Sequence, residues 1–198
     1  MPVDDYVVDI VRGELLIEVQ TGGFYPVRDK IRKLAEERRV RLVHPLPRDK
    51  WLIKLPPDGE GEPERRKSPK HCSPVHIFRE LIRMPRLLVN PNFSLHVLLV
   101  EMEEVRRYEA GRAFARHGWL VQERRLIDVV EPHLFDEPEQ MAGLLPPDMD
   151  EPFTTADLSD HADIRRSLAQ KACYCLRKMN AVEQVGRCGN AHLYRVAE

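Results

Sequence analysis

The sequence predicts an α/β protein with a mixed-sheet core of order ββαββ over residues 1–135 and a small second domain over residues 136–198. Two observations carry this prediction. Runs rich in Val, Ile and Leu flank one segment of helical periodicity near the start of the chain. The last part of the chain has the order helix, turn, helix, hairpin.

The composition is that of an ordinary folded protein. The 198 residues are 42% hydrophobic and 32% charged, which is enough for a packed core. The longest apolar runs fall far short of the roughly 20 residues that cross a bilayer. We therefore expect no membrane partner, and the absence of a leader pattern at residues 1–5 predicts a cytoplasmic protein. The net charge of −1 neither supports nor excludes a nucleic-acid partner.

The chain is expected to open with a β-hairpin followed by a helix. Residues 6–12 and 15–20 are strand-like, and the Gly13-Glu14 pair between them suits a II′ turn. Pro26 fits the first turn of a helix that runs to about Arg38. The face of this helix that packs on the sheet is predicted to carry Val27, Ile31, Leu34 and Ala35.

The remaining elements of the first domain follow from the same patterns. Two strands, residues 40–44 and 51–55, are expected to be joined by a proline-bounded turn, and residues 56–74 to form a polar loop. Further elements are predicted at residues 76–84 (helix), 94–106 (strand), 126–130 (strand) and 136–144 (helix).

The C-terminal segment is expected to hold two helices and a hairpin. A short helix spans residues 155–160, and Asp163 is predicted to cap a long helix over residues 164–180. Two short strands meet around residues 187–190. The buried face of the long helix is predicted to comprise Leu168, Ala172, Cys175, Leu176 and Met179.

Two carboxylates are expected to share one face of the first hairpin. With a turn at residues 13–14, counting outward along both strands places Asp9 opposite Glu18. Opposed side chains have Cβ atoms about 5 Å apart, and like charges there destabilise a sheet unless a cation neutralises them. Gln20 points to the same face as Glu18 because it lies two residues further along the strand. The alternative is that these are polar residues on a solvent-facing strand.

The segments DIVRG at residues 9–13, LIEVQT at 16–21 and RLVHP at 41–45 carry a resemblance to a known family. With Asp9 on one hairpin strand and Glu18 on the next, the chain resembles the PD-(D/E)XK nucleases, and within them a family of uncharacterised bacterial proteins with a C-terminal winged helix. The resemblance extends over nearly the whole chain and implies a restriction-endonuclease-like core. Members of that family usually have a helix ahead of the hairpin, so the start of this chain is expected to be trimmed or that helix dispensable.

The resemblance also implies a mechanism, metal-assisted hydrolysis of a phosphodiester in DNA. In it, Asp9, Glu18 and the carbonyl of Val19 bind Mg²⁺ or Mn²⁺, hard cations that prefer oxygen ligands. The bound ion polarises the phosphate and lowers the pKa of the attacking water.

A lysine is expected in this site, and the sequence offers two residues for its role. Gln20 occupies the lysine position of the motif; glutamine orients water but supplies no positive charge. Some members of the superfamily move the lysine to the following helix. At 100° per residue Lys30 lies about 60° from Val27, against about 120° for Lys33. Lys30 is therefore the better candidate on the helix.

The last ~45 residues resemble a winged helix, which implies contacts between the long helix and DNA. The alternative is a solvated basic face. The expected DNA contacts are Arg165, Arg166, Gln170, Lys171, Tyr174, Arg177 and Arg187.

Three functions are thus open. The first is an Mg²⁺-dependent endonuclease. The second, favoured by Gln20 in the lysine position, is a nuclease-like DNA-binding regulator without catalysis. The third is a scaffold whose winged helix binds another protein. A homodimer is compatible with each of them.

Overall fold

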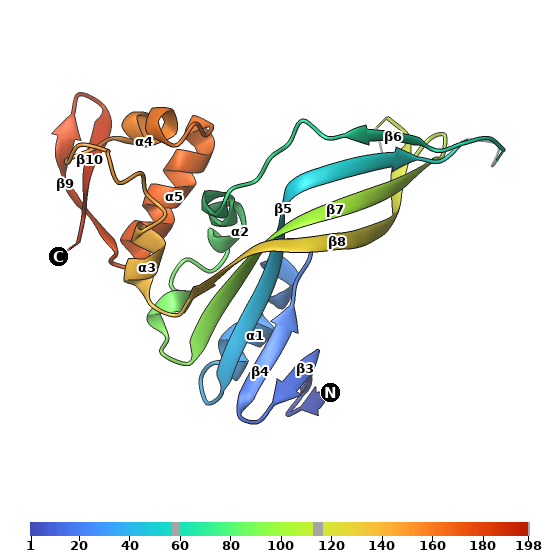
Figure 1. The fold of residues 1–198 in the computed structure, drawn as a ribbon. Coiled ribbons are helices and arrows are strands. Elements are labelled where there is room, and N and C mark those ends of the chain that lie inside the picture. Colours follow the sequence, from blue (N-terminus) through green and yellow to red (C-terminus); the bar gives the residue numbers. More distant parts are fainter. Residues whose placement is uncertain (57–59, 113–116, 198) are drawn as a thin grey trace. The chain divides into compact units, whose positions relative to one another are not determined.

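The computed structural model describes residues 1–56, 60–112 and 117–197, and it is a mixed α/β structure (Figure 1). A six-stranded sheet has the order β3-β4-β5-β7-β8, with β6 paired to β5. The chain divides into two compact units: unit 1 comprises Met1–His44, Pro74–Val97 and His133–Glu198, and unit 2 comprises Pro45–Ser73 and Leu98–Pro132. The division into domains at residues 135 and 136 stays a prediction.

The elements have the following bounds. The strands are β1 (Pro2–Val3), β2 (Tyr6–Val7), β3 (Ile10–Arg12), β4 (Leu15–Val19), β5 (Arg39–Lys54), β6 (Glu64–Lys67), β7 (Phe93–Tyr108), β8 (Trp119–Phe135), β9 (Val182–Cys188) and β10 (Ala191–Val196). The helices are η1 (Tyr25–Val27), α1 (Arg28–Leu34), η2 (Pro74–Ile77), α2 (Phe78–Leu81), η3 (Leu87–Val89), α3 (Pro138–Ala142), α4 (Thr155–His161) and α5 (Arg166–Lys178).

The predicted first hairpin is confirmed. Strands β3 and β4 are antiparallel, and their register pairs Arg12 with Leu15 and Ile10 with Ile17. Gly13 has a φ of +60°, and a positive φ is what the first central residue of a II′ turn requires. The first strand is shorter than expected, because residues 6–7 form β2 and pair with β1 instead.

The helix after the hairpin returns the chain to the neighbouring strand. Segments η1 and α1 connect β4 to β5, and these two strands are parallel, with Leu15 beside Arg39 and Val19 beside Val43. A parallel pair needs such a crossover, since a tight turn reverses the chain direction. On α1 the predicted inward face is largely confirmed, because Ile31 and Leu34 are buried together with Ala35 just beyond the helix.

The expectation of two strands joined by a turn at residues 45–49 was wrong, because Arg39–Lys54 is one continuous strand. The carbonyl of Val43 faces β4 by accepting from the N–H of Gln20. Alternate residues of a strand present their N–H groups to the same edge, so Pro45 and Pro47 lack an N–H on the side where β4 has already ended. Proline is tolerated at such an unpaired edge.

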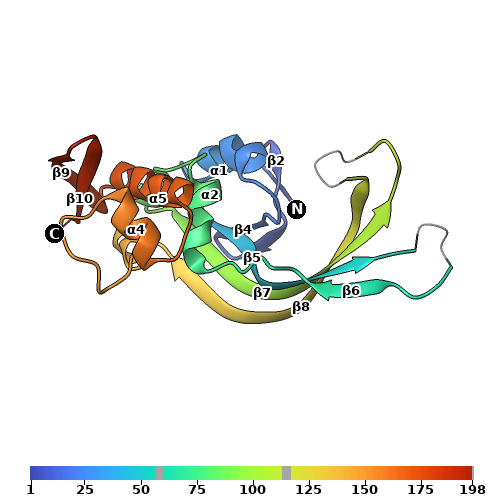
Figure 2. The same ribbon diagram turned by 90° about the horizontal axis from the view of Figure 1, so that it is seen from above.

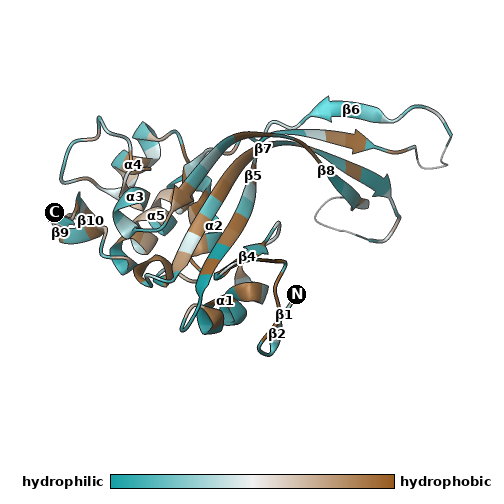
Figure 3. Cartoon of the chain, turned by 60° about the horizontal axis from the view of Figure 1, so that its bottom comes forward, coloured by the Kyte–Doolittle hydropathy of each residue, from teal (hydrophilic) through white to brown (hydrophobic). Residues whose placement is uncertain are grey.

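Two further strand predictions need correction. Within the expected polar loop, Glu64–Lys67 forms β6 and pairs antiparallel with β5, and Figure 3 shows it as strongly hydrophilic. The strand expected at residues 126–130 is much longer, Trp119–Phe135. The part of the expected loop at residues 57–59 lies outside the described residues. The long strand predicted at residues 94–106 is confirmed as β7.

Most of the hydrophobic core lies in unit 1. The largest fully buried side chains among the described residues all belong to this unit, and they come from every part of it: the N-terminal crossover, η2 and α2, β7 and the C-terminal helices. Helix α2 packs on α5, so the C-terminal helices share this core (Figure 2). Residues of this core include Phe24, Ile31, Leu42, Phe78, Leu81, Leu95, Phe153, Leu158 and Leu176.

The order helix, helix, hairpin of the C-terminal segment is confirmed by α4, α5, β9 and β10. Thr154 caps α4 by accepting from the backbone N–H groups of Ala156 and Asp157. The expected cap at Asp163 was wrong: its φ is +47°, a turn conformation, and α5 begins three residues later. The predicted buried face of α5 is confirmed in all five positions.

Unit 2 holds a nearly buried carboxylate that cations neutralise. Glu104 on β7 lies 3.3 Å from Lys50 Nζ and 2.6 Å from the guanidinium of Arg106. Burial by itself would raise the pKa of Glu104, but hydrogen bonds and charges from Arg106 and Lys50 outweigh it and the pKa is lowered. Glu104 is therefore ionised and belongs to an ion-pair network.

No helix within the described residues has both the length and the apolar character needed to cross a membrane.

Candidate functional site

The two predicted carboxylates lie together at the base of the first hairpin. Asp9 directly precedes β3, and continuing the β3–β4 register outward by one pair places it opposite Glu18. The Oδ2 atom of Asp9 accepts a hydrogen bond of 2.8 Å from the backbone N–H of Val19. Asp9 is exposed, whereas Glu18 is buried. The hairpin thus leaves the carboxylate of Asp9 exposed and that of Glu18 buried.

Lys30 joins these residues from the following helix. Its Nζ lies 2.6 Å from Oε2 of Glu18, with side chains 17% and 10% exposed respectively, and it also donates to the carbonyl of Val7. The structure brings Asp9, Glu18 and Lys30 together, as the sequence predicted for the lysine on the helix. A charge with so little access to water is stabilised by such a pair, because an unpaired one is costly.

The side chain of Gln20 bonds to the turn after β4 and not to Asp9 or Glu18. Its side-chain amide donates to the carbonyl of Gly23 at 2.7 Å, which orders the turn after β4. The backbone carbonyl of Gln20 accepts a 2.6 Å hydrogen bond from Nδ1 of His44, so His44 carries its proton on Nδ1. Gln20 therefore has a structural role in this conformation, and Lys30 is the group beside Glu18.

His44 is a residue of this site that the sequence analysis did not single out. It is buried on β5 next to the end of β4, and the ring of Phe24 contacts it edge-on with centroids 4.9 Å apart. Burial lowers the pKa of His44 although its hydrogen bond to Gln20 opposes this, so the ring is neutral at pH 7. The sequence signal that could have identified His44 is a histidine within the apolar first part of β5.

The donor atoms present fit a hard cation. In the described part of the chain, Oδ1 of Asp9 and Oε1 of Glu18 accept no hydrogen bond, so each carboxylate keeps one oxygen for another partner. Oxygen donors of this kind are what Mg²⁺ and Mn²⁺ prefer. Among the described residues no group of three or more His, Cys, Asp or Glu side chains is arranged around a common point. A metal here would therefore need the Val19 carbonyl and water as further ligands.

The expected DNA contacts on the C-terminal segment lie in different environments. Arg166 donates to the hydroxyl of Thr155 at 2.8 Å, and Arg177 donates to Gln184 at 3.1 Å, so both guanidinium groups brace neighbouring elements. Lys171 is half-buried. The remaining expected contacts, Arg165, Gln170, Tyr174 and Arg187, are exposed.

The fold and this site define a mixed α/β protein with a paired-carboxylate hairpin. The chain belongs to the family described as a domain of unknown function, DUF8091, whose model matches residues 1–136. It is 30% identical over 155 residues to an uncharacterized protein of Treponema pallidum, an alignment that covers 77% of this chain and 61% of that protein. The chain thus spans less than two thirds of the relative's length. No solved structure matches.

The ion pair between Lys30 and Glu18 yields a prediction for stability. Replacing Lys30 by Met leaves the Glu18 carboxylate without its cation, and we expect the free energy of unfolding to fall by about 1–3 kcal/mol. Lys33→Met is the matched control, because Lys33 pairs with Glu36 at an exposed position and its loss should change stability by less than about 0.5 kcal/mol. Urea denaturation measures both. Equal effects of the two substitutions would contradict a structural role for the Lys30 pair.

The lowered pKa of His44 gives stability a defined pH dependence. Below its unfolded pKa of 6.5 the unfolded chain binds a proton at His44 that the folded chain does not. The free energy of unfolding should therefore fall as the pH drops from 7.5 to 5.5, and His44→Gln should reduce this slope. His96, whose pKa is also lowered by burial, leaves a residual slope.

The control for this prediction is His117→Asn, because His117 is exposed and its φ of +50° suits asparagine. Denaturant titrations at several pH values measure the slopes. A His44→Gln protein with the slope of the wild type would show that His44 titrates alike in both states.

Proposed function

We propose that this protein is a metal-dependent endonuclease that hydrolyses phosphodiester bonds in DNA. The observation that carries the proposal is the grouping of Asp9, Glu18 and Lys30, with Lys30 Nζ 2.6 Å from Glu18 Oε2 and one oxygen of each carboxylate left for a cation. Two carboxylates with a lysine beside them are what the resemblance to PD-(D/E)XK nucleases implies for a catalytic site.

The local topology supports the proposal. An antiparallel hairpin, β3–β4, is followed by a helical crossover and a parallel strand, β5, and the carboxylates lie on the hairpin while the lysine comes from the helix. This is the ββαβ arrangement that a restriction-endonuclease-like core would have. The match of the family model to residues 1–136 covers these elements but says nothing of activity.

Each residue of the site would have a distinct part in hydrolysis. Asp9, Glu18 and the Val19 carbonyl would hold Mg²⁺ or Mn²⁺, which lowers the pKa of a bound water and polarises the phosphate when it is present. Lys30, fixed by Glu18 and the Val7 carbonyl, would place a positive charge next to the reacting phosphate. The amide of Gln20 is engaged with Gly23, so Lys30 is better placed than Gln20 for this part.

The C-terminal segment would supply DNA binding as a winged helix over residues 136–198. In this proposal α5 is the recognition helix and the β9–β10 hairpin is the wing. Support comes from its exposed polar and aromatic positions, Arg165, Gln170, Tyr174 and Arg187.

A second candidate function is that of a DNA-binding protein whose nuclease-like core lacks catalysis. The observation that favours it is the Lys30–Glu18 pair itself, because the ammonium already neutralises Glu18 without any metal ion. A carboxylate satisfied in this way is stable as a purely structural feature.

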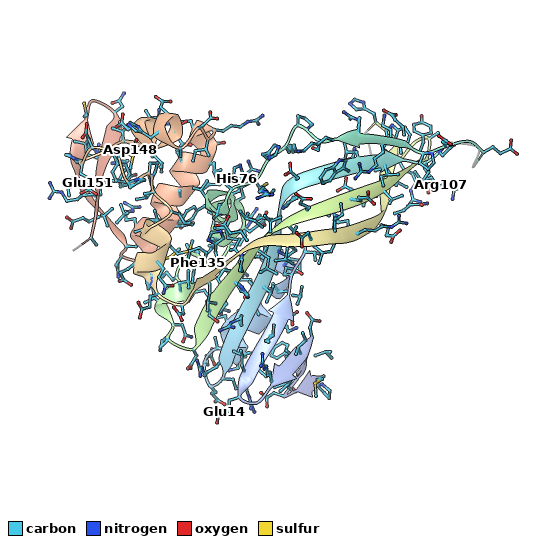
Figure 4. All side chains as sticks on the ribbon, viewed as in Figure 1. Glu14, His76, Arg107, Phe135, Asp148 and Glu151 are labelled. Carbon is cyan, nitrogen blue, oxygen red and sulfur yellow. The ribbon has the colours of Figure 1, made fainter. Side chains whose placement is uncertain are left out.

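Nicking of supercoiled plasmid in the presence of Mg²⁺ or Mn²⁺ distinguishes the two. We expect the wild type to nick DNA only with metal, and Asp9→Asn, Glu18→Gln and Lys30→Met to lose activity by on the order of 10²-fold or more. The matched control is Glu14→Gln, since Glu14 lies at the tip of the same hairpin (Figure 4). It should nick like the wild type.

Two outcomes would refute the nuclease. One is nicking by Glu18→Gln at the wild-type rate, which would point to a contaminating enzyme. The other is DNA binding by the wild type with no cleavage under any metal condition, which is the result expected for the inactive DNA-binding protein.

A further inference from the structure

Unit 1 has a surface groove whose lining is strongly basic. The cations come from three separate parts of the chain: Arg28 and Arg32 on α1, Arg83 and Arg86 after α2, and Lys178 at the end of α5. Tyr174, one turn before Lys178, also lines it. Together these six residues are called the basic groove; Figure 2 shows α1, α2 and α5, on which or directly after which they lie. Its volume is about 440 Å³, and no acidic residue of the described chain lines it.

The basic groove continues into a second hollow on the same surface. A second hollow of about 500 Å³ adjoins it and shares Arg86, Asn90 and Lys178. A ligand that follows the two hollows would be extended and would meet several cations in succession.

These cations are poorly compensated within the chain. Arg28 and Arg32 share one exposed carboxylate, that of Asp29, at 3.2 Å each. Within the ranges that the structure describes, Arg83, Arg86 and Lys178 form no ion pair. The whole chain has 31 basic and 32 acidic residues, so a groove with five cations and no carboxylate departs from its average surface. Such a poorly compensated cluster favours a polyanionic ligand.

The groove also has an aromatic side chain. Tyr174 is 39% exposed, and Lys178 Nζ lies 5.7 Å from the centre of its ring. Arginine forks match phosphate oxygens, and an exposed ring next to cations stacks on a nucleotide base. The buried apolar side chains of Met84 and Leu87 also line the groove.

We propose that the basic groove binds a single-stranded segment of nucleic acid, with its phosphates on Arg83, Arg86 and Lys178 and a base on Tyr174. The choice of nucleic acid as the ligand rests on the proposed function, but the groove is a different site. On α1, Arg28 and Arg32 are each two residues from Lys30, which places them about 160° around the helix. The groove therefore faces away from Asp9 and Glu18, and it uses only Tyr174 of the contacts that the sequence predicted on α5.

Fluorescence anisotropy with a labelled single-stranded oligonucleotide in EDTA tests the groove separately from any catalysis. We expect Arg83→Glu/Arg86→Glu to weaken binding by about tenfold or more and to lower the slope of log K against log salt by roughly two. The control is Arg39→Glu/Arg107→Glu, an equal charge change at exposed positions, of which Arg107 is marked in Figure 4. It should retain most of the binding.

Variants of Tyr174 provide a second test of the basic groove in the same binding experiment. Tyr174→Phe should bind as the wild type does, and Tyr174→Ala should bind the single strand more weakly while its circular dichroism spectrum is unchanged. A wild type that binds no single-stranded oligonucleotide, or equal losses in the two charge-reversal variants, would overturn the proposal.

The two proposals fail separately. If Arg83→Glu/Arg86→Glu binds normally while Glu18→Gln abolishes nicking, the groove is wrong and the nuclease stands. If the groove variant loses binding but the wild type nicks no DNA with any metal, the groove stands and the nuclease is wrong.

Discussion

The nearly buried pair of Glu18 and Lys30 is the constraint around which the N-terminal part of unit 1 is arranged. Glu18 lies on β4 with little access to water, and a charge in that position needs a cation. Lys30 meets this need only because the crossover through α1 brings the helix back over the hairpin. The same ammonium donates to the Val7 carbonyl, so one side chain joins the N-terminal segment, the hairpin and the helix.

Local chemistry made this site predictable from the sequence. A glycine at position 13 fixes the turn, the turn fixes the register, and the register places Asp9 opposite Glu18. Helical geometry then selected Lys30 over Lys33. The long strand β5 could not be predicted in this way, since prolines usually end a strand and their tolerance depends on which edge is unpaired. The basic groove could not be predicted from the sequence either, because Arg28, Arg83 and Lys178 are far apart in the chain and line one hollow only after folding.

In the two proposals, the two sides of α1 have different functions. One side carries Lys30 and faces the carboxylates of the hairpin, where chemistry would take place. The other carries Arg28 and Arg32, which line the basic groove, where a strand would be held. Charge explains the division. Lys30 is paired with the nearly buried Glu18, whereas Arg28 and Arg32 share the single exposed carboxylate of Asp29 and keep positive charge for a phosphate.

The proposed nuclease requires that Asp9 and Glu18 bind a divalent metal next to Lys30. The most direct test is a crystal structure of the protein with Mn²⁺, with data collected for the anomalous signal of manganese. We expect an anomalous peak bound by the free oxygens of Asp9 and Glu18 and the Val19 carbonyl, with Lys30 still in contact with Glu18. Crystals that show Lys30 and Glu18 paired as here and no manganese between the carboxylates, at saturating metal, would contradict this requirement.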